Sequence, residues 1–278
     1  MKKLLNELIQ LQELYFALEE HKVGGEEEQL KELAESIHDL LKQLPPETAD
    51  YFQQLQRRDP PAIAPVVNHT CYGCGINLST SLSAEILHFD SLYQCPNCAR
   101  YLYPYQGPKL TLHDPSLQHK LPRLGIEKFS SEKLMLTRIQ ADTGPGAISE
   151  IAHLISNQLY FPDPQILIDK TLRRETIMPT AMDHGLAFPH VRGVDAGCLT
   201  LALGIKPKGI KFGAAKNHLT KIFFFIVIPI AASAFYLKLL AGLIETFQKT
   251  EARKALLACE TPPDLWKTLK KLTSKYIR

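Results

Sequence analysis

The chain has 278 residues, of which 45% are hydrophobic, and this composition is that of a folded protein with room for two domains. Its formal net charge of +3 is too small to predict strong non-specific binding to nucleic acid.

The first residues, Met1 to Leu5, briefly imitate a secretion signal, but polar residues such as Asn6 and Glu7 interrupt it, so we expect no export. The most apolar run, residues 222–235, contains Pro229 and is shorter than the roughly twenty residues that a membrane helix needs. We therefore expect a cytoplasmic protein without membrane insertion. In that reducing compartment, the six cysteines are better suited to metal binding than to disulfides.

Residues 1–66 are predicted to be helical. Two sets of apolar residues recur every three or four positions, and each makes one stripe of coiled-coil type: Leu4, Leu8, Leu11, Tyr15 and Leu18, then Leu30, Leu33, Ile37, Leu40 and Leu44. Gly24 and Gly25 separate the stripes, which predicts an antiparallel hairpin, and a third helical segment is expected around Tyr51. Because a short hairpin has little core of its own, it should pack on the next module or on a partner.

Residues 67–106 contain two C-x-x-C pairs, Cys71 with Cys74 and Cys95 with Cys98, with twenty residues between them. Two such pairs bring four thiolates to the corners of a tetrahedron, which is the geometry of a structural Zn²⁺ ion. A pair of redox-active dithiols is the alternative, but catalytic dithiols rarely occur in two copies at this spacing. Since four cysteines complete the coordination shell, one zinc ion per chain is predicted to hold structure and to perform no chemistry.

Several motifs of this region occur together: Leu44–Glu47, Cys71–Cys74, Glu85-Ile86 and Cys95–Tyr103. On these residues, the N-terminal part resembles the bacterial C4-type zinc-ribbon family, in which a helical hairpin, longer than the one here, precedes the ribbon. The resemblance implies an adaptor for proteins or nucleic acid. Aromatic and apolar residues near the cysteines outnumber basic ones, which favours a protein partner: Tyr72, Leu92, Tyr93, Tyr101 and Tyr103 against Arg100. RNA is the alternative, because aromatic side chains stack on bases.

Residues 107–123 hold three prolines among polar residues, which is typical of an extended linker, and the next domain is expected at residues 124–278. In this domain, apolar segments predicted as strands alternate with helical ones, so we expect a sheet covered by helices on both faces. The strands are predicted at 198–204 and 222–228, and the helices at 164–174, 236–247, 252–258 and 265–272. Cys198 and Cys259 have no useful spacing and are predicted to be buried small apolar residues.

The segment Asp183–Arg192 carries the residues best suited to chemistry. Leu186 to Phe188 is predicted as a short buried strand that Pro189 ends, so His190 should emerge at a strand end, where α/β folds commonly build sites. Imidazole is a usable nucleophile at neutral pH, and Arg192 is a fixed cation that clamps phosphate oxygens well. For this pattern alone, a satisfied structural histidine is the alternative.

The same segment, His184–Arg192, looks like a family signature normally written G-[IV]-A-[IVF]-P-H-x-R, and further matching segments follow the family's order: 134–139, 147–155, 201–204, 209–212 and 236–243. On these residues, the chain from Leu124 onward resembles the IIA domain of the fructose/mannitol/nitrogen-regulatory class of the bacterial phosphotransferase system. The resemblance implies an α/β domain with a mixed sheet, in which His190 accepts a phosphoryl group from the carrier protein HPr. The chain is thus predicted to be multidomain: a short α-helical hairpin with a zinc ribbon, then this domain.

Tyr236 is a departure from that family, because it stands where the family has a second histidine that helps hold the phosphorylated site. Tyrosine offers a hydroxyl but no positive charge at neutral pH. The resemblance implies that Arg192 steadies the equatorial phosphoryl oxygens and that Tyr236 replaces the histidine as a neutral donor. His184 lies at a variable position of the signature and either donates a hydrogen bond or only lies at the surface.

Three functions stay open, and the favoured one is a regulatory phosphocarrier with the zinc module as its adaptor. A sugar-uptake phosphocarrier ranks lower, because nothing in the sequence looks like the membrane or IIB parts of a transporter. A non-catalytic zinc-ribbon scaffold with a degenerate IIA fold is the third. Whether His190 takes up phosphate separates the first from the third and decides whether the chain counts as an enzyme component.

Overall fold

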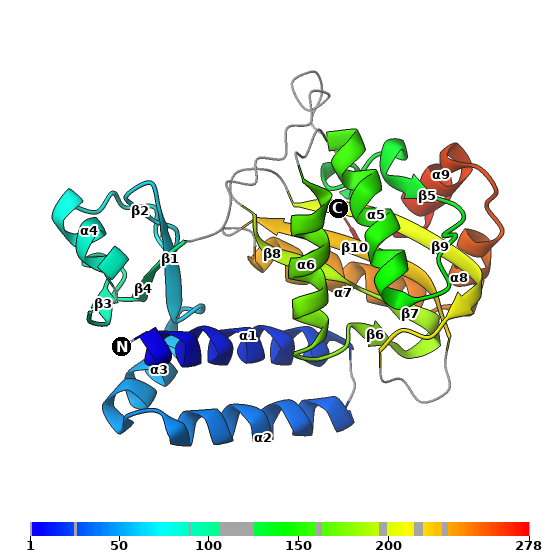
Figure 1. The fold of residues 1–278 in the computed structure, drawn as a ribbon. Coiled ribbons are helices and arrows are strands. Elements are labelled where there is room, and N and C mark those ends of the chain that lie inside the picture. Colours follow the sequence, from blue (N-terminus) through cyan, green and yellow to red (C-terminus); the bar gives the residue numbers. More distant parts are fainter. Residues whose placement is uncertain are drawn as a thin grey trace. The chain divides into compact units, whose positions relative to one another are not determined.

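The computed structural model describes residues 2–24, 27–88, 90–105, 125–159, 163–194, 199–213, 219–229 and 233–277 (Figure 1). The chain divides into two compact units, residues 1–108 and residues 109–278. The predicted linker 107–123 lies outside the described residues, as do Gly25 and Cys198.

Three helices open the first unit: α1 (Lys2–Gly24), α2 (Glu27–Gln43) and α3 (Pro46–Arg58). α1 and α2 lie side by side and run in opposite directions, which confirms the predicted hairpin (Figure 1). Buried residues of the predicted stripes face its core: Leu8, Leu11, Leu33, Ile37 and Leu40. α3 starts at Pro46, because proline is tolerated in the first turn of a helix, where the missing N–H is not needed.

The rest of the first unit is a small sheet with one helix: β1 (Ile63–Val67), β2 (Thr70–Cys71), α4 (Thr80–His88), β3 (Tyr93–Gln94) and β4 (Tyr101–Pro104). The strand order is β2-β1-β4-β3, in which only the pair β1 and β4 is parallel. The sheet begins at Ile63, inside the stretch predicted to be helical. The prolines at positions 60 and 61 cannot continue α3, and the β-branched residues that follow favour a strand.

The hairpin packs on this sheet, as its small core led us to expect. The hydroxyl of Tyr51 on α3 donates to the carbonyl of Ala99 at 2.9 Å, and its ring meets that of Tyr101 edge-on at 5.3 Å between centroids. Phe52 of the same helix is 0% exposed and packs against Tyr15 of α1. A hydrogen bond and an aromatic contact therefore join α3 to the ribbon, and the hairpin and the ribbon are parts of one folded unit.

The second unit is built on six strands: β5 (Met135–Leu136), β6 (Ala181–Met182), β7 (Leu186–Ala187), β8 (His190–Val194), β9 (Thr200–Ile210) and β10 (Thr220–Pro229). The order is β5-β9-β10-β7-β6, and β8 also pairs with β10. β10 is antiparallel to β9 and parallel to β7 and β8, so the sheet is mixed, as predicted. The side chains of residues 222–228 on β10 are almost completely buried, which a strand covered on both faces requires.

Helices cover both faces of this sheet: α5 (Gly144–Leu159), α6 (Pro164–Glu175), α7 (Ser233–Phe247), α8 (Thr250–Leu257) and α9 (Pro262–Thr273), with short 3-10 turns η2 (Gly125–Lys128), η3 (Glu132–Leu134) and η4 (Asp183–Gly185). In Figure 1, α5 and α6 lie in front of the sheet and α7 lies behind it. α6 has the predicted start, because Pro164 occupies its first turn and the Asp163 carboxylate accepts the N–H of Gln165.

One part of a prediction about this sheet was wrong: the short strand ends before Pro189 as expected, but His190 does not emerge beyond it. β7 stops at Ala187, but β8 begins at His190, and both strands pair with β10 in parallel. Proline lacks an N–H, yet its carbonyl accepts the N–H of Ile226 at 2.9 Å, so the backbone stays beside β10 through the interruption. His190 is therefore buried inside the unit, with 0% of its surface exposed.

Candidate functional site

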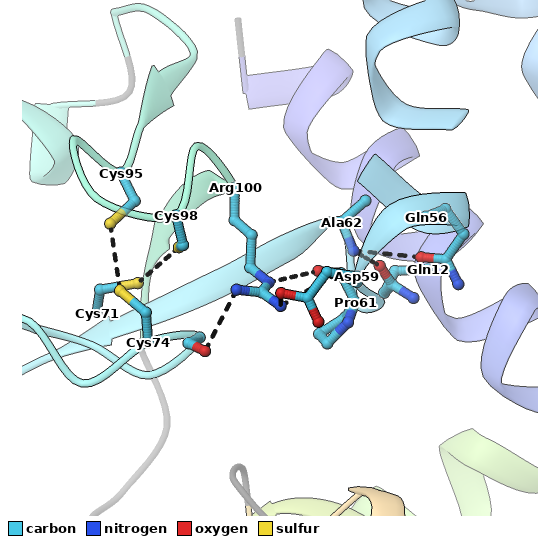
Figure 2. Close-up of polar contacts among 11 residues, drawn as sticks. Gln12, Gln56, Asp59, Pro61, Ala62, Cys71, Cys74, Cys95, Cys98 and Arg100 are labelled. Atoms are coloured by element: carbon cyan, nitrogen blue, oxygen red, sulfur yellow. Dashed lines mark hydrogen bonds and ion pairs between the residues drawn. The ribbon is translucent and has the colours of Figure 1, made fainter. Parts of the chain in front are cut away.

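The first candidate site is formed by Cys71, Cys74, Cys95 and Cys98, whose Sγ atoms all lie within 4.8 Å of one another (Figure 2). The sulfurs of Cys71 and Cys98 are 3.9 Å apart, and those of Cys74 and Cys95 are 3.6 Å apart. Around a tetrahedral zinc ion with Zn–S bonds of about 2.3 Å, neighbouring sulfurs lie about 3.8 Å apart. The four free thiols already have this spacing, so they fit a structural zinc ion.

The two C-x-x-C turns have the same backbone hydrogen bonds. The N–H of each first cysteine donates at 2.9 Å to the carbonyl five residues later, from Cys71 to Ile76 and from Cys95 to Arg100. The residue four positions after each first cysteine has a positive φ, 78° at Gly75 and 62° at Ala99, and its N–H donates back to that cysteine. Each pair of sulfurs is thus held by its own turn, and the pairing of β1 with β4 joins the strand pairs that carry the two turns.

The thiols differ in how easily they ionise. Burial raises the pKa of Cys71 and Cys95, although backbone hydrogen bonds oppose it. At Cys74, which is exposed, burial also raises the pKa, but hydrogen bonds from Asn97, the Ile76 backbone and the neighbouring thiols outweigh it and lower the pKa to about 6. Because a metal binds the thiolate form, the lowered pKa of Cys74 favours metal binding at this sulfur.

The second candidate site surrounds the imidazole of His190, the first residue of β8. α6 brings Arg174 against this ring, α7 brings Tyr236, and β8 itself supplies Arg192 two residues further on, on the same face of the strand. Arg174 is 6% exposed and Tyr236 is 1% exposed. The structure thus brings three of the four predicted residues together, namely His190, Arg192 and Tyr236.

The hydrogen bonds of His190 assign its protonation. Nδ1 lies 3.0 Å from the carbonyl oxygen of Phe188, which only accepts hydrogen bonds, so Nδ1 carries a proton. The Nε of Arg174 donates to Nε2 at 3.1 Å, so Nε2 carries a lone pair. Together these two bonds describe a neutral imidazole whose nucleophilic atom is Nε2.

Tyr236 lies between His190 and Arg192. Its hydroxyl is 3.5 Å from Nδ1 of His190, a long contact, and the two rings are tilted with centroids 5.4 Å apart. The guanidinium carbon of Arg192 lies 4.9 Å from the centre of the tyrosine ring, which is a cation–π arrangement. Tyr236 therefore positions the arginine as well as bounding the imidazole.

His184 is set apart from this group. It is exposed on η4 and has a positive φ of 67°. The following strand starts with Leu186 opposite Ile222, whereas His190 lies opposite Ile226. Four positions along a strand correspond to about 13 Å, so His184 lies further than this along the sheet. Among its predicted roles, this placement favours a surface residue.

Arg174 was missed by the sequence reasoning, although it makes the closest polar contact to Nε2. Its only sequence signal is the pair of arginines at the end of α6: Arg173 is exposed, whereas Arg174 points inward and also donates to the carbonyl of Met178 at 2.9 Å. Arginine is almost never buried without a partner, so one of two arginines turned into an apolar core indicates a partner there.

Comparison with known families finds a match in each of the two units. Residues 70–102 match the model of the C4-type zinc ribbon domain. Residues 128–272, just over half of the chain, match the model of the phosphoenolpyruvate-dependent sugar phosphotransferase system EIIA 2 family. The chain therefore belongs to this EIIA family, and it carries a C4 zinc ribbon ahead of the EIIA domain.

Several individual proteins are similar to the second unit. A fructose-specific EIIA component from Haloferax volcanii is 27% identical over 119 residues, which are 43% of this chain and 77% of that protein. A nitrogen regulatory protein from Pseudomonas aeruginosa is 22% identical over 144 residues, 51% of this chain and 92% of that protein. The crystal structure of the nitrogen regulatory protein IIA-Ntr from Neisseria meningitidis has 17% identity and a TM-score of 0.47, covering 51% of this chain and 96% of that one.

None of the helices that the structure describes is long and apolar enough to cross a bilayer.

Proposed function

We propose that this chain is a regulatory member of the EIIA family that accepts a phosphoryl group on His190 from the phosphohistidine of an HPr-type carrier protein in the cytoplasm. The unprotonated Nε2 of His190 carries the proposal, because the Phe188 carbonyl holds the ring in one tautomer and the Arg174 guanidinium donates to the Nε2 lone pair. The names of two relatives, a fructose-specific EIIA component and a nitrogen regulatory protein, support the same class of function.

In the transfer, the Nε2 lone pair forms the new N–P bond while the N–P bond of the donor histidine breaks. The donor ring leaves as a neutral imidazole that keeps a proton on its other nitrogen. His190 keeps its own proton on Nδ1, and the hydrogen bond to the Phe188 carbonyl stabilises that proton in the phosphorylated ring. The reaction therefore needs positioning and nearby positive charge, which Arg174 and Arg192 supply.

The arginines also control access to the nucleophile. His190 is 0% exposed, and Arg174 donates to the atom that must attack phosphorus, so this side chain has to leave Nε2 first. Once displaced, its guanidinium lies beside the incoming phosphoryl oxygens, and Arg192 adds a second positive charge. Tyr236 contributes a hydroxyl without charge, so transfer is slower than with a histidinium in its place.

Labelled phosphoenolpyruvate, incubated with the general phosphotransferase components and the full chain, tests the proposal. We expect one acid-labile phosphate per chain in the parent protein and none in His190→Ala. His153→Ala is the matched control, because this histidine is exposed on α5 and should leave the labelling unchanged. Label that persists in His190→Ala would contradict the assignment of the acceptor.

The same assay separates the alternatives. If the folded parent is never labelled, the protein is a non-catalytic scaffold with a degenerate EIIA domain, a reading that the buried nucleophile and the tyrosine at position 236 favour. If the label passes on to a sugar-specific EIIB protein and then to sugar, the chain is a sugar-uptake phosphocarrier.

For the zinc unit, we propose an adaptor role toward a protein partner. Micromolar binding of the full chain to mixed RNA that weakens with salt would overturn this role.

A further inference from the structure

Arg100 connects the two halves of the first unit through its buried guanidinium, which is 6% exposed as a side chain. Its Nε donates to the carbonyl of Pro61 at 2.8 Å, and one terminal nitrogen donates to the carbonyl of Gly73 at 3.3 Å. The other terminal nitrogen donates to the carbonyl of Asp59 at 3.1 Å and forms an ion pair with its carboxylate (Figure 2). A single side chain therefore binds both the first cysteine turn and the segment that follows α3.

Both cysteine turns contribute to this arrangement. The backbone carbonyl of Arg100 accepts the N–H of Cys95, so the residue is fixed to the second turn, while its side chain reaches Gly73 between the two cysteines of the first. A Cβ atom at Gly73 would lie only 2.7 Å from Cδ of Arg100, so no larger residue fits there without displacing the arginine. The contact thus requires the two turns to keep one relative position, which four bonds to a single zinc ion impose.

Hydrogen bonds also join the segment held by Arg100 to the helical hairpin. The segment held by Arg100 leads into Ala62, whose N–H is shared by the side-chain oxygens of Gln12 on α1, at 2.7 Å, and of Gln56 on α3, at 3.2 Å (Figure 2). The hydroxyl of Tyr51 on α3 adds a separate bond to the carbonyl of Ala99 in the second turn. Hydrogen bonds therefore run without a break from the cysteine turns to two helices of the hairpin.

The negative charge of a zinc–thiolate centre also favours the position of the Arg100 guanidinium. Zinc bound by four thiolates has a formal charge of about −2, which attracts a nearby cation. Burial lowers the pKa of the Arg100 guanidinium, but the negative charges of Cys98 and Asp59 outweigh it and raise that pKa. The Asp59 carboxylate is 65% exposed and therefore well solvated. A buried guanidinium is costly without nearby negative charge, so the zinc–thiolate centre favours the position that Arg100 occupies.

We propose that Arg100 is a positioning residue that couples zinc binding to the docking of the helical hairpin. Zinc fixes the two turns, the fixed turns hold Arg100, and Arg100 holds the segment between α3 and β1. By thermodynamic linkage the coupling is reciprocal: zinc stabilises the docked hairpin, and loss of the Arg100 contacts weakens zinc binding. The zinc ion thus controls the surface that the first unit offers to a partner, beyond stabilising its own ribbon.

The first experiment follows hydrogen exchange in the full-length protein, loaded with zinc and after chelation under reducing conditions. We expect faster exchange not only in the cysteine turns but also at the amides of Ala62, α3 and the part of α1 around Gln12. Hairpin amides that are equally protected with and without zinc would overturn the coupling, and this arm needs no variant.

The second experiment measures zinc affinity by competition with a chromophoric chelator. Arg100→Gln should bind zinc about 10–100-fold more weakly, the usual effect of removing a group that orients metal ligands. Arg100→Lys keeps the charge but loses the forked bonds and should recover only part of that loss. Arg58→Gln is the matched control, since this arginine is exposed at the end of α3, and it should bind zinc like the parent.

Two further readouts separate coupling from a general loss of stability. The absorption bands of the Co²⁺-substituted protein, which report the thiolate ligands, should shift in Arg100→Gln and stay unchanged in Arg58→Gln. Zinc-loaded Arg100→Gln should also exchange faster in the hairpin than the zinc-loaded parent. If Arg100→Gln folds with parental zinc affinity and parental hairpin protection, the proposal is wrong.

Discussion

Under the proposed function, the negative charge of a phosphoryl group arriving at His190 meets two arginines and a neutral tyrosine. Arg174 already donates to Nε2, and Arg192 lies against the ring of Tyr236. The tyrosine hydroxyl reaches Nδ1 only at 3.5 Å, so it adds little to a nitrogen already bonded to Phe188. The charge balance of the phosphorylated state therefore depends on the arginines, and the residue at position 236 tunes it.

Tyr236→His should increase the rate or the extent of phosphorylation by about tenfold or somewhat more, because one charge-assisted hydrogen bond contributes about 1.5–3 kcal/mol at most. The measurement is the time course of label incorporation from phosphoenolpyruvate. Tyr236→Phe is the control that keeps the ring below Arg192 and removes only the hydroxyl, and it should resemble the parent. A Tyr236→His protein that is labelled no faster than the parent would show that the tyrosine does not limit transfer.

Arg174→Gln should slow phosphorylation by about tenfold or more, because the loss of a charged donor outweighs the freer access to Nε2. The variant should also unfold about 1–3 kcal/mol more easily, since the Met178 carbonyl loses its buried donor. Arg173→Gln, an exposed change one position earlier, should alter neither value. Labelling kinetics and urea unfolding, measured on the same preparations, distinguish the effect on phosphorylation from the effect on stability. Unchanged labelling kinetics in Arg174→Gln would show that this arginine takes no part in the transfer.

At the scale of helices and strands, local pattern explains the elements that the sequence predicted well. Cysteine spacing identified the zinc site, apolar periodicity located the hairpin and most helices of the second unit, and the continuous apolar run of β10 indicated a central strand. Contacts between residues far apart in the sequence could not be predicted from these local patterns. Arg174 meets His190 because α6 packs on β8, and the direction in which a helical arginine points depends on packing that spacing alone does not reveal.

The same limit explains the error at Pro189. A proline is a valid signal for the end of a strand, because it removes one N–H from the ladder. What kept this segment in the sheet was the carbonyl of that proline bonding to Ile226, a residue 37 positions later in the sequence. The sequence thus located the histidine correctly at the end of a strand but could not show that it would be buried beside β10.

Gly185, which precedes β7, offers a test at this scale. It has a φ of 76°, and an added Cβ would lie 2.9 Å from the backbone oxygen of Leu219. Gly185→Ala should therefore destabilise the second unit by about 1–3 kcal/mol, the usual cost of such strain. Gly185→Asn tolerates the positive φ but keeps the steric conflict, so it should recover only part of the loss in urea unfolding. An alanine variant as stable as the parent would show that the turn rearranges freely.

At the scale of the whole molecule, the two units have separate hydrophobic cores, one around the hairpin and ribbon and one around β10. The four cysteines predicted to bind zinc all lie in the first unit. Chelation under reducing conditions should therefore abolish the calorimetric transition of the first unit and leave the melting temperature of the second unchanged. Metal analysis of the untreated protein should give close to one zinc per chain. A second unit that melts together with the first after chelation would contradict this independence.

The hydrogen bond from Arg174 to Nε2 of His190 blocks the nucleophilic nitrogen in the resting state. If His190 accepts phosphate as we propose, transfer proceeds only from the fraction of molecules in which Arg174 has moved away from Nε2. At low donor concentration, the observed rate is that fraction multiplied by the rate of the open form. Above a certain concentration of donor, extra carrier protein no longer speeds the reaction, because the swing itself sets the pace. The same guard shields the imidazole from small acylating reagents, so the unphosphorylated protein keeps its reactive nitrogen intact while it waits for a partner large enough to displace the arginine.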